Sequence, residues 1–454
     1  MKAQLSYLRD YITENLWVIP SLLTASAIAL SFALGALDRS PWGQSLGELG
    51  WVYPIDPPGA RLTLSTVAGS MVTVTSLVFS LTILALTVAA QQLGPRLLRS
   101  FVRDRPTQVV LGVFLSTVVF ALLVLRTVND SDGQDFVPYC SLVAALVLTI
   151  ASFGALIFFM HHMATTMQAD TVIANVTRDL HDALVRTFPE SEEAASRRGE
   201  EESDAASLRA SVRDRGRAVT VGHSGYIQIL DYQGLVQIAA SRDLTIALPS
   251  RAGHFVISDS PLAFVAPAEA VEDDLVAEIR ECVLLGARRT PAQDPEFLFA
   301  NLVEIAVRAL SAGVNDNYTA TACIDRLCEA LAEVLHRPPL PAAMADEEDT
   351  VRLVRDPPTF AHLLDSAFNE IRQSAPGNVA ILSRMADRLA MLAALAERPP
   401  ERRALGRHAE WIGESARRHI DNRDDRERVT TPIAALLSSA QDAGAAPGTG
   451  GPAA

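Results

Sequence analysis

Residues 61–92 read RLTLSTVAGSMVTVTSLVFSLTILALTVAAQQ, and this stretch decides the fold class. It is apolar enough to cross a bilayer, which takes about 20 apolar residues in a helix. At ~1.5 Å per residue, a helix of roughly 30 residues covers ~45 Å, more than the ~30 Å hydrocarbon core. We therefore expect a spanning helix that tilts or protrudes.

Hydroxyl side chains in this stretch repeat every seven residues, close to two helical turns, and so predict one stripe along the helix. The stripe consists of Thr66, Ser70, Thr73, Leu77, Ser80, Leu84, Thr87 and Gln91. One interpretation is helix packing, because small hydroxyl residues allow close approach and hydrogen bonds between helices. The other is a lumen surrounded by several subunits, in which Leu77 and Leu84 form hydrophobic constrictions that gate by dewetting.

Three further apolar runs bring the number of predicted spans to four. The four runs are residues 16–37, 62–90, 109–128 and 139–160. None has an acidic or basic residue in its middle, which argues against a proton- or sodium-coupled transporter. The first run is too long for a signal peptide and lacks a basic segment before it, so we expect it to remain in the protein.

Charges in two loops predict the orientation. The loop after the second span contains Arg96, Arg99, Arg103 and Arg105, whereas residues 129–138 contain three aspartates and no base. The positive-inside rule places the arginine-rich loop in the cytoplasm, together with both termini. We expect these arginines to contact anionic lipid, or to stand at the inner mouth of a path. The bias toward arginine and alanine fits a GC-rich bacterial genome, and the expected location is the bacterial inner membrane.

About 290 residues follow the last span and are expected to be cytosolic. Five short β-prone runs, at 218–221, 225–230, 244–248, 254–257 and 262–266, are separated by turn residues, with a short helix within 231–243. Helical patterns follow at 269–289, 296–311, 318–336, 359–373, 377–397 and 401–421.

These patterns predict seven segments along the chain. They are an interfacial segment (1–15), a four-helix transmembrane domain (16–160), an amphipathic helix (161–188), a charged flexible linker (189–216), a small β-rich domain (217–267), an α-helical domain (268–428) and a disordered tail (429–454).

The segment DPEFLFANLVEIAVRALSAGVNDNYTATACIDRL, residues 294–327, predicts two helices joined by a tight turn. Gly313 suits the left-handed position after the first helix, and Asn317 or Thr319 suits the N-cap of the second. Arg308, Asn315, Asp316 and Thr319 are a candidate ligand site or interface, because a helix N-terminus with a nearby arginine suits an anion. Alternatively, these residues only determine the hairpin.

Several functional classes are excluded or disfavoured by composition. The net charge of −14 disfavours nucleic acid as a partner. Lys2 is the single lysine, so there is no lysine for a P-loop, a Schiff base or a lipoyl or biotinyl attachment. The four cysteines have no metal-ligand spacing, and no catalytic signature is present. We expect no enzymatic activity, no cofactor and no metal.

Three stretches together resemble the bacterial predicted membrane-protein family known as domain of unknown function 2254. They are residues 63–104, SGYIQILD with LVQIAASRDL (224–231 and 235–244), and residues 294–327. The resemblance extends over most of residues 10–425, although the family pattern often has proline where Ala312 and Asn317 stand. It implies the membrane architecture, and it implies neither an activity nor catalytic residues.

The sequence thus predicts an α-helical membrane protein with four transmembrane helices, followed by a cytosolic region with a small β-rich domain and an α-helical domain. Two functions are weighed. The first is an oligomeric ion channel or pore in which the second span lines the path and the cytosolic region assembles or gates it. The second is a non-conducting, membrane-anchored scaffold or sensor whose cytosolic domain binds a protein partner or an anionic ligand. The expected partners are the lipid bilayer and further copies of the chain.

Overall fold

A computed structural model describes residues 17–40, 55–93, 104–128, 136–166, 168–188 and 198–444. The chain divides into two compact units, Met1–Val172 and Ile173–Ala454. The predicted interfacial segment 1–15 lies outside the described residues.

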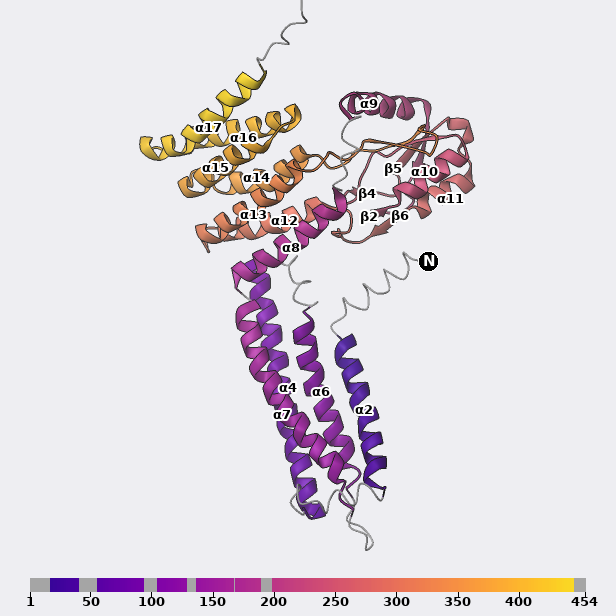
Figure 1. The fold of residues 1–454 in the computed structure, drawn as a ribbon, viewed down its shortest axis with the longest axis vertical. Coiled ribbons are helices and arrows are strands. Elements are labelled where there is room, and N and C mark those ends of the chain that lie inside the picture. The colour runs from indigo at the N-terminus through magenta and orange to yellow at the C-terminus, as the bar shows by residue number, and fades with distance from the viewer. Residues whose placement is uncertain are drawn as a thin grey trace, which may run out of the picture. The chain divides into compact units, whose positions relative to one another are not determined.

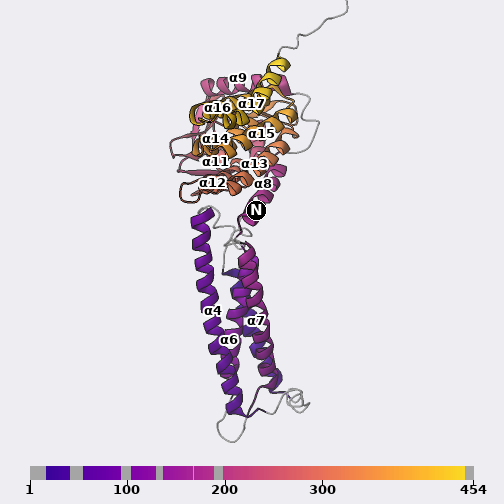
Figure 2. The same ribbon diagram turned by 90° about the vertical axis from the view of Figure 1, so that its left-hand side faces the viewer.

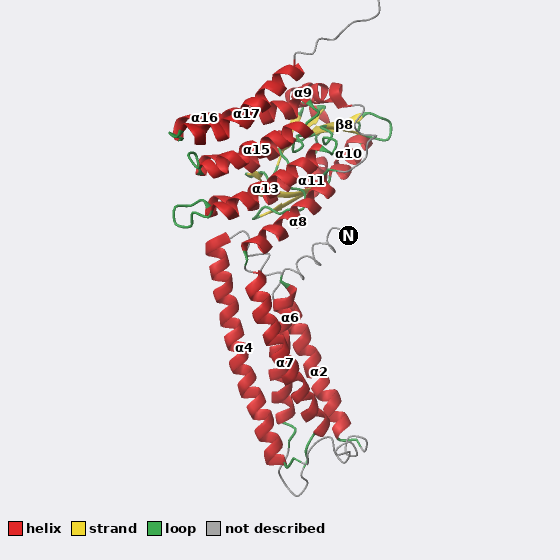
Figure 3. Ribbon diagram, turned by 60° about the vertical axis from the view of Figure 1, so that its left-hand side comes forward, coloured by secondary structure: helices red, strands yellow, loops and turns green. Residues whose placement is uncertain are grey.

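Within its described residues, the first unit contains four helices that are each long and apolar enough to cross a membrane (Figure 1). They are α2 (Val18–Asp38), α4 (Pro57–Leu93), α6 (Arg105–Leu125) and α7 (Tyr139–Thr166). The four predicted spans are therefore confirmed, although α4 extends beyond 62–90 at both ends and α7 continues past residue 160. The three other helices pack around α6, and α4 forms one edge of the bundle (Figures 2 and 3).

Aromatic side chains fill the core of the bundle. Phe114 and Phe120 of α6 are fully buried, as is Phe159 of α7. From α4, Leu64 and Met71 pack into the same two clusters. Packing between the spans therefore depends on large side chains of α6 that meet one face of α4.

The second unit begins within α8 (Ala169–Thr187), whose apolar face includes the buried residues Ile173, Val176, Leu180 and Leu184. Arg337 follows helix α13 (Asn317–Leu335) and holds the end of α8, because its Nη1 donates to the carbonyl of Phe188, 2.5 Å away. The helix thus packs by one side, as its amphipathic pattern requires.

The prediction of a flexible linker at 189–216 is wrong for residues 198–215, which form helix α9 (Arg198–Arg215). Ala205 and Val212 are buried in a cluster with Ala247 and Val354. Arg209 pairs with Asp356 at 3.2 Å. The few apolar residues of α9 thus lie on one face of the helix and pack against a sheet. The highly charged composition of the segment gives no indication of this tertiary contact. Residues 189–197 lie outside the described part.

In the part of the chain that the structure describes, eight strands form two sheets, ordered β1-β5-β3-β8-β7 and β4-β2-β6. Their bounds are β1 Arg217–Thr220, β2 Gly225–Leu230, β3 Thr245–Ala247, β4 Phe255–Val256, β5 Pro261–Ala266, β6 Val283–Gly286, β7 Ala343–Ala345 and β8 Val351–Val354. All pairs are antiparallel except β3 with β8, where Ile246 lies opposite Leu353. Helices α10 (Tyr232–Ser241) and α11 (Asp273–Glu281) contribute Leu235 and Leu275 to the core of these sheets.

The predicted boundary between a β domain ending at 267 and an α domain starting at 268 is therefore wrong. Leu353, on β8, is fully buried in the core formed by β1 to β5. The predicted helix 269–289 is also wrong, because α11 ends at Glu281 and β6 follows to pair with β2. Pairing with a partner strand outweighs the helical pattern there, since it satisfies the backbone of Val283–Gly286.

The remaining helices form a layer beside the sheets (Figure 1). Besides α13, they are α12 (Pro295–Ala309), α14 (Phe360–Ser374), α15 (Val379–Leu395), α16 (Pro399–His419) and α17 (Arg423–Gly444), with a short 3₁₀ turn η3 (Ala268–Ala270) before α11. The prediction of a disordered tail at 429–454 is wrong for residues up to Gly444, which belong to helix α17. Val429, Ile433 and Leu436 of α17 are buried, and the helix packs on α15 and α16.

Candidate functional site

Helix α4 has two faces of different character. Leu64, Val67, Met71 and Val78 are buried against the other spans. The predicted stripe lies on the opposite face. Its members from Thr66 to Thr87 are all exposed, and the side chain of Gln91 is outside the described part. Leu77 and Leu84 are 64% and 58% exposed. The stripe therefore does not serve packing within one chain.

The hydroxyl groups of the stripe donate to carbonyls of the preceding helical turn. Thr66 donates to Leu62 at 2.7 Å, Thr73 to Gly69 at 3.1 Å and Thr87 to Ile83 at 2.9 Å. Ser70 does the same toward Val67, at 3.1 Å. The protons of these four hydroxyls are thus satisfied inside the helix, and each oxygen keeps acceptor capacity toward water, an ion or a neighbouring helix.

The outward face of α7 differs from that of α4. It presents large apolar side chains, among which Ile150, Ile157 and Phe153 are 71%, 72% and 50% exposed. The outward face of α4 is rich in small residues, with Ser65, Gly69 and Ser76 beside the stripe. Large apolar surface suits lipid chains, whereas small and hydroxyl residues suit close contact with protein or water. The membrane unit therefore has two chemically distinct outer faces.

The beginning of α6 and the end of α7 meet at one end of the bundle. Asp104 caps α6 by accepting from the Thr107 amide at 3.1 Å, and His162 Nε2 lies 2.8 Å from the same carboxylate. The His162 ring stacks on Phe158 with 5.6 Å between centroids. Arg105 is the first residue of α6, while Arg96, Arg99 and Arg103 lie outside the described residues.

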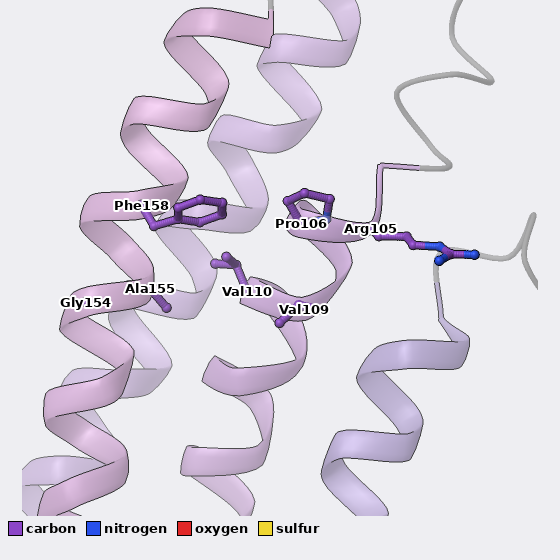
Figure 4. Close-up of a pocket in the computed structure, with 7 residues that line it drawn as sticks. All are labelled: Arg105, Pro106, Val109, Val110, Gly154, Ala155 and Phe158. Carbon is purple, nitrogen blue, oxygen red and sulfur yellow. The ribbon is translucent and has the colours of Figure 1, made fainter. Parts of the chain in front are cut away.

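A groove opens beside this end of the bundle, between α6 and α7 (Figure 4). Its volume is about 480 Å³. It is lined by Arg105, Pro106, Val109, Val110, Gly154, Ala155 and Phe158. The guanidinium of Arg105 points away from the apolar lining (Figure 4).

The predicted capping of the 308–319 turn is corrected by the structure. Asn315, with φ of 52°, takes the left-handed position that was expected for Gly313. Asp316, rather than Asn317 or Thr319, is the N-cap of α13. Asparagine tolerates this backbone region better than most residues, and aspartate is among the best N-caps.

The N-terminus of α13 has little room for an external anion. Asp316 accepts from the amides of Tyr318 and Thr319 at 3.0 and 3.1 Å, and from the Thr319 hydroxyl at 2.5 Å. These bonds, the hydroxyl first, hold the pKa of Asp316 below its usual range. Arg308 Nη2 instead lies 3.3 Å from Glu304. The structure thus brings Asp316 and Thr319 together, and the carboxylate occupies the amides that a bound anion would need.

Thiol chemistry is suppressed in the second unit. Burial raises the pKa of Cys282 and Cys328 to about 11, and that of Cys323 to about 12. A thiol must lose its proton to act as a nucleophile or a metal ligand. At neutral pH these three cysteines are therefore protonated, small apolar residues.

A family model described as Predicted membrane protein (DUF2254) matches residues 13–391. This chain belongs to that family. Uncharacterized protein Rv1290c of Mycobacterium tuberculosis is 30% identical over 431 residues, which cover 92% of this chain and 80% of the relative. Uncharacterized protein Mb1321c of Mycobacterium bovis matches with the same identity and coverage. No solved structure matches the chain. The resemblance seen in three stretches of sequence is thus confirmed, and so is a membrane protein as the class.

Two polar contacts in this DUF2254 member were missed by sequence reasoning. Asp38, at the end of α2, is 3% exposed and accepts from the amides of Cys140 and Ser141 at 2.8 and 3.1 Å. Deeper in the bundle, the hydroxyls of Thr117 and Ser152 lie 3.0 Å apart. Asp38 follows an apolar run like an ordinary loop residue, so only the position of α7 reveals its role as a cap.

Proposed function

We propose that the protein is an oligomeric channel or pore of the bacterial inner membrane, with α4 lining the path. In this proposal both termini are cytoplasmic, and the second unit assembles or gates the ring without catalysis or a cofactor. The observation that carries it is the exposed hydroxyl stripe, which faces away from its own bundle while α7 presents a lipid-like outer face. A ring of chains would turn the α4 faces inward and the α7 faces outward.

The stripe has the chemistry that a gated aqueous path requires. Its hydroxyl oxygens can accept from water or coordinate a cation, while the protons of Thr66, Ser70, Thr73 and Thr87 stay bonded to the helix. Leu77 and Leu84 interrupt the row of hydroxyls and would form apolar rings in an oligomer. Such rings gate by dewetting, so that a small change in radius closes the path.

Cysteine accessibility along α4 tests the proposal. Cys140, Cys282, Cys323 and Cys328 are first replaced, and single cysteines are introduced at 66, 73, 80 and 87. A membrane-impermeant thiol reagent is then applied to membranes. We expect labelling at these positions and protection at the buried positions 64, 71 and 78. Uniform protection of 66, 73, 80 and 87 would refute a hydrated face.

The alternative is a non-conducting scaffold or sensor, and one observation favours it. The turn between α12 and α13 is exposed, with Val314 and Tyr318 58% and 91% exposed. An apolar and an aromatic side chain at a tip can anchor a protein partner. Substituting Tyr318→Ser should leave conductance unchanged in a pore of which the tip is no part. Absence of conductance in the reconstituted wild type, together with a protected stripe, would favour the scaffold.

A further inference from the structure

We propose that a cavity between α14 and α16 binds a small phosphate anion, either free phosphate or the phosphate group of a small organic molecule. The cavity lies wholly within the second unit, where these two helices pack on each other. Its volume of about 210 Å³ is below the roughly 300–1,000 Å³ of drug-sized sites, so it suits a small ion. The site does not depend on conduction by α4.

Arg372, which lines the cavity from the last turn of α14, is a cation without a counter-ion. Its side chain is half-buried and makes no ion pair or hydrogen bond within the described part of the chain, and its Nε is buried without an acceptor. The dipole of α14 favours a cation in this turn, but it does not satisfy the donors of the guanidinium. Since buried polar groups of native proteins are nearly always bonded to protein, water or an ion, an anion in the cavity would supply the missing partner.

Trp411 of α16 holds this guanidinium in place. The Cζ atom of Arg372 lies over the Trp411 ring, 5.5 Å from its centre, which is a cation–π distance. Stacking on a ring leaves the donors at the edge of the planar guanidinium available, and this edge matches the oxygens of a phosphate in a bidentate manner. The contact therefore orients the cation for an oxyanion.

The charges of the lining favour an anion. Two guanidinium groups, those of Arg372 and Arg418, line the cavity with one carboxylate, that of Glu414. Arg418 donates to Glu414, so these two groups neutralise each other. The lining thus keeps one positive charge, and that charge belongs to the arginine that has no partner of its own.

The loop after α14 fixes one wall of the cavity. The Ser415 hydroxyl donates to the carbonyl of Pro376 at 2.9 Å, which ties this loop to α16. Gly377 approaches the same helix so closely that an added Cβ would lie 3.1 Å from the carbonyl oxygen of His419. A preformed cavity loses little conformational freedom when it binds a ligand.

Titration of the full chain in detergent with inorganic phosphate tests the site, and Trp411 supplies the signal. Trp17, Trp42 and Trp51 are first replaced by Phe, so that Trp411 is the single fluorophore of its type. We expect a saturable fluorescence change and a matching calorimetric dissociation constant with phosphate, but neither with chloride at equal ionic strength. A halide cannot accept two parallel hydrogen bonds as a phosphate does. Equal responses to chloride and phosphate, or no saturable binding by calorimetry, would overturn the proposal.

Glycerol phosphate distinguishes the two sources of the anion. Tighter binding of glycerol phosphate than of inorganic phosphate would support the site and identify a small organic phosphate as its ligand. The reverse order would support the site and identify free phosphate.

Variants that shift affinity in opposite directions separate the site from misfolding. Arg372→Gln should weaken phosphate binding at least about tenfold, because a hydrogen bond to a charged group exceeds the ~1.4 kcal/mol that a factor of ten requires. Arg372→Lys should recover part of the loss, since it keeps the charge without the fork. Glu414→Gln should tighten binding severalfold, because it removes a negative charge from the lining and releases Arg418.

Arg326→Gln is the matched control, because Arg326 is an exposed arginine of α13 that does not line the cavity. It should bind phosphate as wild type does. Equal weakening in Arg326→Gln and Arg372→Gln would mean unspecific attraction to positive surface and would overturn the site. So would weaker binding in Glu414→Gln than in wild type.

Discussion

His408 is fully buried in α16, between the rings of Phe368 and Trp411. Its Nε2 lies 2.7 Å from Asp365 Oδ1, while its Nδ1 has no hydrogen-bond partner among the described residues. Burial lowers the pKa of His408, although Asp365 opposes the shift. Burial, helped by Arg251, also lowers the pKa of His254. Both side chains are thus neutral in the native protein at pH values where an unfolded histidine is already protonated.

These two histidines make stability depend on pH. Below a pH of about 6.5 the unfolded chain binds protons that the native chain does not, so the free energy of unfolding falls as pH decreases. We expect the melting temperature to drop from pH 7.5 to pH 5.5, and His408→Gln to show a shallower slope. The exposed His223, replaced by Gln, is the control and should leave the slope unchanged. Equal slopes for all three proteins would contradict the assignment to His408.

Asp316 provides a second test at a single residue. Asp316→Ala removes the N-cap of α13 and should lower stability by roughly 1 kcal/mol, or about 2–4 °C in melting temperature. Asp316→Asn keeps an acceptor for the Tyr318 and Thr319 amides and should recover most of the loss. Equal losses in both variants would mean that the negative charge, and not the cap, matters.

Sequence reasoning located this turn and missed its details. The two helices on either side follow from their apolar periodicity and lie close to the predicted ranges. Several adjacent residues of the turn, Asn315, Asp316 and Asn317 among them, are all competent caps. The residue that becomes the N-cap depends on the path of the turn. Here the Asp316 amide donates to the Ala309 carbonyl, 2.7 Å away, and the packing of α12 on α13 fixes this path.

At the scale of elements, α17 shows how composition can mislead. Its sequence holds Pro432 and runs into a tail rich in alanine and glycine, features typical of a disordered end. Yet Val429, Ile433 and Leu436 recur at helical spacing and are buried on α15 and α16. The same holds for α9, where two buried apolar residues among many charges determine the helix.

Truncation measures the contribution of α17. A chain ending at residue 428 loses the burial of three apolar side chains, each worth ~1.5–3 kcal/mol. We expect a loss of several kcal/mol in stability and faster proteolysis of the second unit. A chain ending at Gly444 retains the whole helix and is the control. Equal protease resistance of the two chains would show that α17 adds little.

Helix α4 carries the prediction for the pore. Leu77→Ser or Leu84→Ser removes an apolar ring from the proposed path and should raise conductance and impair growth. Phe79→Ser is the control, because Phe79 is exposed on α4 but lies about 160° around the helix from Leu77 and about 140° from Leu84. Conductance in planar bilayers is the measurement. Identical conductance in all variants and wild type would argue against the pore, and a loss of stability alone would indicate a packed interface.

For the whole molecule, the number of chains in the assembly is the decisive quantity. A pore lined by one helix from each chain needs a ring of about four or more, since a dimer leaves no lumen. We expect light scattering of the purified protein to give at least about four copies. Replacing Gly69 by Leu should lower that number, because a large side chain on the small-residue face of α4 prevents close approach. A dimer in both proteins would exclude a path lined by α4.

The architecture at this scale was predictable for the membrane unit and only in part for the rest. Spans are visible in sequence because a bilayer demands uninterrupted apolar runs. In the second unit, by contrast, strands of one sheet are separated along the chain by helices that belong to another layer. Leu353 pairs across from Ile246 after the α12–α13 hairpin has intervened, and no local pattern marks such distant partners.

This parallel pairing of β3 with β8 has a consequence during synthesis. About a hundred residues separate the two strands, so at ~5–20 residues per second a ribosome needs about 5–20 s to deliver β8 after β3. For that time Ile246 and Ala247 present an unpaired strand edge on a chain already held at the membrane. In a ring assembled during translation, neighbouring nascent chains would present the same edge at the same moment. During this interval, the unpaired β3 edges of neighbouring nascent chains must be kept from pairing with one another, either by a holdase or by the spacing of the ribosomes.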